Sequence, residues 1–208
     1  MKDAQLPMPS KGKLLIGITG GIGSGKSLAS GFFESSGYTI IYADEVAKRV
    51  YRVNSSLKQR LVKAFGKHIL DSSGNISGIE ARKIILSDKK NVKKVNRIVH
   101  PFVVKEINEI IKKANDNIVL IEAAIMFESG YYRKMNYTIL IYAPKELRIK
   151  RVSRRDKIPK SEVRRLINLQ IDEREKIKLA DFIIRNDGSK QKLLNALKTF
   201  NNFIKMLS

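Results

Sequence analysis

The chain has 208 residues, 43% of them hydrophobic, so it is long enough to fold around one full core. It contains no cysteine, which excludes disulfides, thiolate metal sites and a cysteine nucleophile. No window is long and apolar enough to span a membrane, and residues 1–13, with two prolines and no apolar run, predict a flexible arm rather than a secretory signal. We therefore expect a cytoplasmic protein with a single domain over residues 14–208.

Positive charge dominates the composition, with 41 lysine and arginine residues against 20 acidic ones and a net charge of +21. Such a field attracts phosphorylated small molecules or nucleic acid. It can equally reflect a general lysine bias, because much of the excess is scattered over presumed helix surfaces. The charge alone leaves all three interpretations open.

The first predicted strand, Leu14–Thr19, leads into a glycine-rich loop and then into a predicted helix, Lys26–Ser35. The loop is Gly20-Gly21-Ile22-Gly23-Ser24-Gly25-Lys26-Ser27, which is G-x-x-x-x-G-K-S between a strand and a helix. Glycines bring backbone N–H groups close to an anion at the positive end of the helix. Lys26 would reach the β- and γ-phosphates, and the Ser27 hydroxyl would ligate Mg²⁺. The loop predicts binding of a nucleoside triphosphate.

A second strand, Tyr38–Tyr42, is predicted from its β-branched and aromatic residues. It ends at Asp44, which is suitably placed to cap a helix predicted over Glu45–Tyr51. Ligands bind at the carboxyl ends of parallel strands, so Asp44 is also a candidate catalytic base. Both roles remain open.

Residues 55–115 have a helical pattern that is broken by a turn at 71–75 and resumes with a short helix over 79–86. The long helix that follows contains His100-Pro101. A proline there should kink the helix or restart it, and a kink can aim His100 at a cleft. The alternative is a packed histidine without a ligand.

The third predicted strand, Ile118–Ile121, brings Glu122 to the same sheet edge as the glycine loop. Glu122 is therefore a candidate for holding the water shell of a metal. Glu128, a little further on, can equally be a capping or surface acid. A fourth strand is predicted over Tyr137–Tyr142.

The most basic stretch of the chain, Arg148–Arg165, predicts a helical hairpin with a turn near residues 156–161. Such a hairpin can act as a lid that brings guanidinium groups to a transferring phosphate and excludes water. A solvated charged face is the alternative. The arginines outnumber the lysines here, which favours phosphate binding.

A fifth, edge-like strand is predicted over Phe182–Arg185, followed by Asn186-Asp187-Gly188 and a final amphipathic helix. Five short strands separated by helices predict an α/β protein with a parallel, doubly wound sheet.

From Leu14 to about Ser189 the chain resembles the dephospho-coenzyme A kinase family. The matching motifs, each short but in the family's order and spacing, are Ile18 to Ser27, Ala43-Asp44 with Ala47, His100-Pro101, Phe127-Glu128, Arg155-Asp156, Gln170, Ala180-Asp181 and Asn186-x-Gly188. The sequence departs from the family pattern at Tyr42, Lys48, Gly78, Glu122 and Ala124.

The resemblance implies a five-stranded P-loop kinase sheet with a helical acceptor-binding subdomain at about 47–114 and a helical lid at about 146–177. It implies transfer of the γ-phosphoryl group of ATP, with Mg²⁺, to the ribose 3′-hydroxyl of dephospho-coenzyme A, the last step of coenzyme A synthesis. The implied catalytic residues are Lys26, Asp44, Arg151 and Arg155. ATP would be bound by Gly21, Ile22, Gly23, Ser24, Gly25, Lys26, Ser27, Leu28, Asn186 and Gly188, and the acceptor by Asp44, Lys48, His100, Pro101 and Glu122.

Three other functions are consistent with a phosphate-binding loop. A nucleoside or nucleotide kinase would share the core and differ only in its acceptor. A regulatory GTPase is disfavoured because no N-K-x-D motif is present to bind guanine. A nucleic-acid-dependent NTPase is disfavoured because tryptophan is absent and the arginines form a compact cluster rather than a groove with stacking aromatics. We expect a monomer that acts on small molecules.

Overall fold

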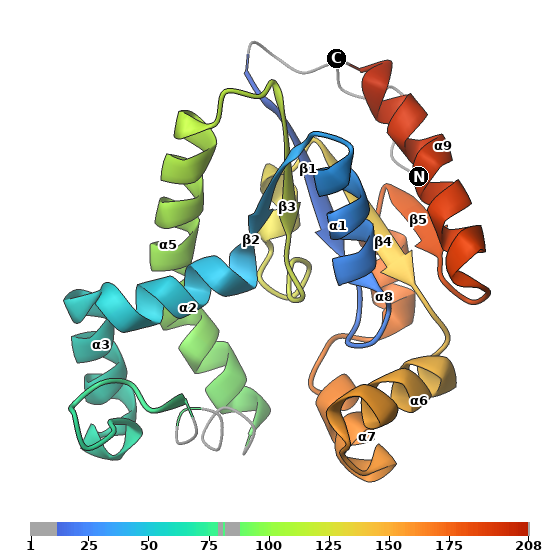
Figure 1. Cartoon of the computed structure of the whole chain (residues 1–208). Helices are drawn as coiled ribbons and strands as arrows, with labels where there is room; N and C mark the ends of the chain where they lie inside the picture. The colour runs from blue at the N-terminus through green and yellow to red at the C-terminus, as the bar shows by residue number, and fades with distance from the viewer. Residues whose placement is uncertain (1–11, 79–80, 82–87, 208) are drawn as a thin grey trace. The chain divides into compact units, whose positions relative to one another are not determined.

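The computed structural model describes residues 12–78, 81 and 88–207 (Figure 1). Its sheet has the strand order β2-β3-β1-β4-β5. The strands are β1 (Leu14–Thr19), β2 (Thr39–Tyr42), β3 (Ile118–Glu122), β4 (Tyr137–Tyr142) and β5 (Phe182–Arg185). The order places β1, which precedes the glycine loop, at the centre. It places β5 at an edge, as predicted.

Parallel pairing aligns the carboxyl ends of the central strands. Ile18 of β1 is in register with Glu122 of β3 and, on its other side, with Ile139 of β4. β4 in turn pairs with β5 in parallel, from Ile139 opposite Phe182 to Tyr142 opposite Arg185. The prediction of a parallel α/β sheet is confirmed.

One face of the sheet is covered by α1 (Lys26–Ser35) and α9 (Lys190–Lys205), which lie side by side in Figure 1. Their apolar sides pack on alternate residues of the strands, because successive side chains of a strand point to opposite faces. The buried residues of this core are Leu14, Ile16, Ile18, Ala29, Phe33, Ile118, Leu120, Tyr137, Ile139, Ile141, Ile184, Leu193, Leu197, Phe200 and Ile204. This core fixes the start of α1 against the end of β1.

On the opposite face lie the segment after β3 and the short helix α8 (Glu173–Leu179), which Figure 1 shows behind the strands. Met126 packs so closely on β1 that a Cβ at Gly17 would lie 2.4 Å from its sulfur. The 3₁₀ helix η2 (Tyr131–Lys134) then leads into β4. Helices and loops thus cover both faces, as expected for a doubly wound sheet.

The basic stretch forms the predicted helical hairpin, α6 (Lys145–Asp156) and α7 (Lys160–Asn168). Lys157 ends α6 in the left-handed conformation, with φ 54°. The two helices share a small apolar core made of Ile149, Val152, Val163 and Ile167. Ile22 of the glycine loop packs against this core, so the hairpin and the loop are in direct contact.

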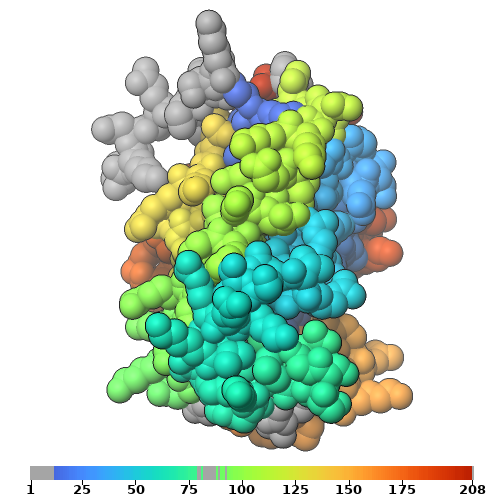
Figure 2. Space-filling view, turned by 90° about the vertical axis from the view of Figure 1, so that its left-hand side faces the viewer, coloured from blue at the N-terminus to red at the C-terminus, as the bar shows by residue number. Residues whose placement is uncertain are grey.

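Two compact units share the chain: Tyr42–Lys113 forms a helical unit, and the segments on either side of it form the sheet unit. The helical unit contains α2 (Ala43–Val53), α3 (Ser55–Phe65), η1 (Lys67–Ile69) and α5 (Lys89–Lys113). Figure 2 shows one face of this unit, on which α5 (green) runs beside α2 and α3 (cyan to teal). The helix predicted over 79–86 falls on residues 79–80 and 82–87, which lie outside the described residues.

One local prediction for this unit was wrong, and one of two alternatives for another is excluded. α2 begins at Ala43, with Tyr42 as its N-cap residue, so Asp44 lies inside the first turn and does not cap the helix. The helix α5 also does not restart at Pro101 but runs through it from Lys89 to Lys113. The proline removes one backbone hydrogen bond, while its neighbours Val99 and Val103 remain anchored in the core.

No helix in the described ranges is both long and apolar enough to cross a bilayer.

Candidate active site

The phosphate-binding loop joins β1 to α1 through a tight backbone turn. Gly23 and Gly25 have φ values of 78° and 100°, which side-chain-bearing residues rarely adopt. The turn is closed by the amide of Ser24, which donates to the carbonyl oxygen of Gly21 over 3.0 Å. No side chain in the described part of the chain caps α1, so its positive end is open toward the loop. This geometry suits a bound phosphate.

Lys26 and Glu122 lie together beside this loop. The ammonium group of Lys26 is 3.3 Å from a carboxylate oxygen of Glu122, and both side chains are largely buried. The parallel register explains the meeting, because it places Glu122 next to the end of β1. Thr19 and Ser24 contribute buried hydroxyl oxygens that have no hydrogen-bond partner within the described residues. Buried hydroxyls normally find partners, so the loop retains unused polar capacity for a ligand.

Asn186, at the end of β5, is bonded directly to the loop. Its side-chain nitrogen donates to the carbonyl oxygen of Ser24 over 2.7 Å. Arg151 of α6 in turn donates to the backbone and side-chain oxygens of Asn186, over 3.1 and 3.3 Å. These two predicted site residues therefore form one network with the loop. Gly188 is exposed just before α9, and Ser27 and Leu28 lie in the first turn of α1.

Arg155 lies on the exposed surface of α6. Its guanidinium group makes two hydrogen bonds with Asp156, of 2.7 and 2.9 Å. These bonds raise the pKa of Arg155, which stays positively charged. Arg155 is therefore held by its neighbour and does not share in the network of Arg151.

An arginine to which we assigned no role from the sequence, Arg148, is the one packed on the loop. Its guanidinium group is buried and lies 2.9 Å from the carboxylate of Glu173. A Cβ at Gly21 would lie only 1.6 Å from Nη1 of Arg148. The position of Arg148 in the basic stretch was visible in the sequence, but its partner Glu173 is 25 residues away (148 to 173) and no local pattern connects them.

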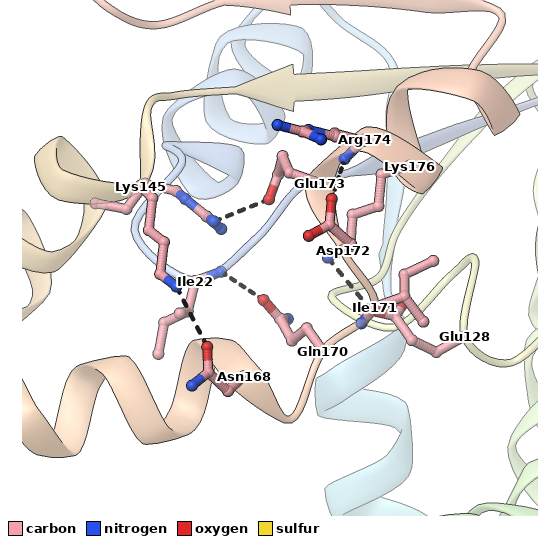
Figure 3. Close-up of polar contacts among 11 residues, drawn as sticks. Ile22, Glu128, Lys145, Asn168, Gln170, Ile171, Asp172, Glu173, Arg174 and Lys176 are labelled. Atoms are coloured by element: carbon pink, nitrogen blue, oxygen red, sulfur yellow. Dashed lines mark hydrogen bonds and ion pairs between the residues drawn. The ribbon is translucent and has the colours of Figure 1, made fainter.

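The segment after α7 also contacts the loop (Figure 3). The side-chain oxygen of Gln170 accepts the amide hydrogen of Ile22 over 3.2 Å. Next to it, the amide of Ile171 donates to Glu128, whose carboxylate lies 3.3 Å from the ammonium group of Lys176. Lys176 is fully buried and Glu128 is largely buried beside it, which excludes the alternative that Glu128 is a surface acid. Glu128 instead joins α8 to the segment after β3.

The remaining predicted residues belong to the helical unit. Asp44 and Lys48 lie one turn apart on α2, and Lys48 makes a 2.7 Å ion pair with Glu45, which raises the pKa of Lys48. His100 and Pro101 lie on α5. His100 is half-buried, and its burial lowers its pKa below the ordinary value of 6.5. These residues are thus presented by two helices that pack on each other.

Comparison with known proteins identifies one family. A family model described as dephospho-CoA kinase matches residues 14–192. A dephospho-CoA kinase of Fusobacterium nucleatum is 30% identical over 187 residues, covering 90% of this chain and 96% of the relative. One of Aquifex aeolicus is 33% identical over 184 residues, covering 88% and 93%.

Solved structures agree with these relatives. A crystal structure of a Thermus thermophilus protein superposes with a TM-score of 0.79 at 30% identity, covering 93% of this chain and 99% of that one. A dephospho-CoA kinase from Campylobacter jejuni gives 0.65 at 30% identity, covering 91% and 96%. A shikimate kinase from Bacteroides thetaiotaomicron shares the fold alone, with a TM-score of 0.54 at 12% identity.

Proposed function

Because the chain belongs to the dephospho-CoA kinase family, we propose that it transfers the γ-phosphoryl group of ATP to the ribose 3′-hydroxyl of dephospho-coenzyme A. The products are coenzyme A and ADP, so the reaction completes coenzyme A synthesis. The observation that carries the proposal is the open phosphate-binding loop at the start of α1, with Lys26 beside it. Phosphoryl transfer needs mainly positioning and charge stabilisation, which such a loop provides.

On the donor side, backbone amides from Gly21 to Gly25 and the ammonium group of Lys26 would hold the β- and γ-phosphates. Leu28 lies in the first turn of α1, where its amide contributes to the positive end of the helix. Asn186 supports this role because it is bonded to the loop at Ser24. Gly188, two residues further on, would leave room for the adenine.

The loop also fits Mg²⁺ as a companion of ATP. Ser27 offers an exposed hydroxyl in the first turn of α1, and Glu122 offers a carboxylate at the end of β3. In kinases this ion is usually bound by only one or two protein oxygens, and phosphates and waters complete its coordination. Ser27 would bind it directly, and Glu122 would contact its water shell. When bound, it supplies charge neutralisation to the phosphates.

On the acceptor side, we assign binding to the helical subdomain at about residues 47–114. Asp44 would accept the proton of the attacking hydroxyl or orient it in line with the γ-phosphorus. Lys48, His100 and Pro101, with Glu122 from the sheet unit, would contact the acceptor. His100 is half-buried, and its burial favours the uncharged imidazole. An uncharged imidazole suits a hydrogen bond to a neutral group of the acceptor better than it suits phosphate binding.

The hairpin and α8, at about residues 146–177, would serve as the lid. Arg151 and Arg155 would stabilise charge on the transferring phosphoryl group and help to exclude water. Arg151 has support from its bonds to Asn186, which connect it to the loop. We further propose that the enzyme is a cytoplasmic monomer, which size-exclusion chromatography with light scattering would test for the oligomeric state.

The deciding experiment measures ADP release with Mg·ATP and a panel of acceptors: dephospho-coenzyme A, AMP, CMP and none. The Lys26→Ala variant serves as the inactive control. Turnover with dephospho-coenzyme A alone is expected. Turnover with AMP or CMP instead would leave a P-loop kinase with another acceptor and contradict the proposal.

A further inference from the structure

Arg148 is a buried cation in contact with the phosphate-binding loop. Its exposed fraction is 2%, and Nη1 is the atom nearest to the position of a Cβ at Gly21. Arginine is almost never buried without partners, because removing its charge from water is costly. The location of Arg148 therefore needs a physical reason beyond the packing of α6.

The hydrogen bonds of Arg148 are incomplete. Nη2 lies 2.9 Å from the carboxylate of Glu173, which fixes one side of the guanidinium group. Nε and Nη1 are buried and have no hydrogen-bond partner in the part of the chain that the structure describes. Donors of this kind normally have partners, so these two N–H groups indicate a ligand or water at the loop.

The other two arginines to which we gave roles are held differently. Arg151 is engaged with both oxygens of Asn186, and Arg155 is paired with Asp156 on the surface. The three atoms nearest to a Cβ at Gly21 belong to Arg148 and Glu173. Nη1 of Arg148 is thus a buried donor without a partner in the described residues that lies beside Gly21.

We propose that Arg148 is a catalytic residue whose Nη1 group donates a hydrogen bond to the terminal phosphate of ATP. The inference rests on the proposed kinase function and assigns a phosphate contact beyond it. Gly21 lies in the loop whose backbone would cradle the phosphates of a bound triphosphate, so a cation beside it is within the phosphate site. A charged N–H donor forms strong hydrogen bonds with phosphate oxygens. Glu173 is the positioning residue, since it holds Nη2 and orients the guanidinium plane.

The test compares the binding of β,γ-imido-ATP and ADP to the full chain by calorimetry, with Mg²⁺ and without acceptor. Arg148→Gln should weaken binding of the triphosphate about 10- to 100-fold, the usual effect of losing charge-assisted hydrogen bonds, and change ADP binding little. Arg148→Lys, which keeps the charge but not the planar guanidinium group that Glu173 orients, should show the same selective loss to a smaller extent. Arg164→Gln, at an exposed ion pair of the same hairpin, is the matched control and should bind both nucleotides like wild type.

Glu173→Gln separates a phosphate contact from a structural ion pair. If Arg148 acts on the phosphate, Glu173→Gln keeps a clear preference for the triphosphate, whereas Arg148→Gln loses it. Equal loss of both nucleotides in both variants would show a structural pair and overturn the proposal. Wild-type binding by Arg148→Gln would also overturn it, because water would then satisfy the two donors.

The fold of every variant is checked by circular dichroism and thermal melting, and Arg148→Lys provides the answer if Arg148→Gln does not fold. These binding measurements require no acceptor, so they are independent of the proposed reaction. Failure of wild type to phosphorylate dephospho-coenzyme A would refute the proposed function alone. If wild type phosphorylates dephospho-coenzyme A but Arg148→Gln keeps the wild-type preference for β,γ-imido-ATP over ADP, only this inference is refuted.

Discussion

The side-chain nitrogen of Asn186 donates a 2.7 Å hydrogen bond to the backbone carbonyl of Ser24, which joins the end of β5 to the phosphate-binding loop. The contact is buried, and a Cβ at Gly25 would lie 2.3 Å from the same nitrogen. The shape of the loop therefore depends on a residue that follows it by 162 positions.

Replacing Asn186 by Asp tests this dependence. The new carboxylate can still accept from Arg151, but it presents an oxygen where Ser24 needs a donor. We expect a loss of about 1–3 kcal/mol in the free energy of unfolding, measured with urea. ATP binding should weaken roughly 10-fold, because the loop loses its preorganised shape. Asn202→Asp, on the exposed side of α9, is the control. Equal effects of the two substitutions would contradict the role of Asn186.

Lys26→Ala should lower turnover with dephospho-coenzyme A by roughly 10²-fold or more, because a positive charge on the transferring phosphate is lost. The substitution also leaves Glu122 without its ion-pair partner. The double variant Lys26→Ala/Glu122→Gln removes this unpaired charge and reports on stability separately. Steady-state kinetics and thermal melting distinguish the effects, and near-wild-type turnover by a folded Lys26→Ala would remove the lysine from the mechanism.

Asp44→Asn is expected to reduce kcat by roughly 10²-fold, with little change in the binding of ATP. Asparagine keeps the shape of the side chain but cannot accept the proton of the hydroxyl. Because Asp44 does not cap α2, the helix should keep its stability. The matched substitution Glu45→Gln, next to it on α2, should retain most of the activity. A comparable loss in both variants would argue for a general charge effect on α2.

The buried pair of Lys176 and Glu128 predicts a large change in stability. Lys176→Met leaves the Glu128 carboxylate buried without its counter-charge, which costs about 3–5 kcal/mol in comparable ion pairs. The double variant Lys176→Met/Glu128→Gln should recover much of this loss, since the amide can still accept from Ile171. Lys178→Met, in an exposed pair with Glu175, should cost less than about 1 kcal/mol. Urea unfolding of the four proteins gives the comparison, and no recovery in the double variant would count against the pair.

The pKa of His100 predicts a pH dependence of stability. Burial lowers this pKa in the folded state below the ordinary 6.5. At pH values between the folded and the unfolded pKa of His100, the unfolded chain binds a proton that the folded chain does not. The free energy of unfolding therefore falls as the pH drops below about 6.5. This fall stops below the folded pKa, and above about pH 7.5 His100 adds no pH dependence.

His100→Gln should therefore flatten the stability curve as the pH falls from about 7.5 through the ordinary histidine pKa of about 6.5. Urea unfolding at several pH values checks this, with the exposed His68→Gln as a control that keeps the wild-type dependence. An unchanged slope in His100→Gln would mean that other groups cause the pH effect.

Much of the fold could be predicted because its signals are local. The glycine loop is read from consecutive residues, and the strands from short apolar runs between turns. The register that brings Glu122 to Lys26 follows from parallel pairing, so it too was accessible. The start of α2 was missed because Ala43 and Asp44 continue directly from β2 into helical geometry, without a capping side chain.

Other parts of the site could not be predicted, because they depend on contacts between distant residues. Arg148 and Glu173 lie on different helices, and Arg151 of α6 bonds to Asn186 in the segment between β5 and α9. A sequence gives the charges of such residues but not which of them turn inward. The burial of Lys176 is the clearest example, since a lysine on a charged helix is normally expected at the surface.

The close approach of Arg148 to Gly21 has an evolutionary consequence. Nothing larger than hydrogen fits at position 21 while the guanidinium group occupies its present place. A side chain can therefore enter position 21 only where the residue at 148 is shorter or turned away, whereas glycine at 21 is compatible with any residue at 148. Relatives that carry a side chain at position 21 should accordingly lack an arginine packed on the loop from position 148.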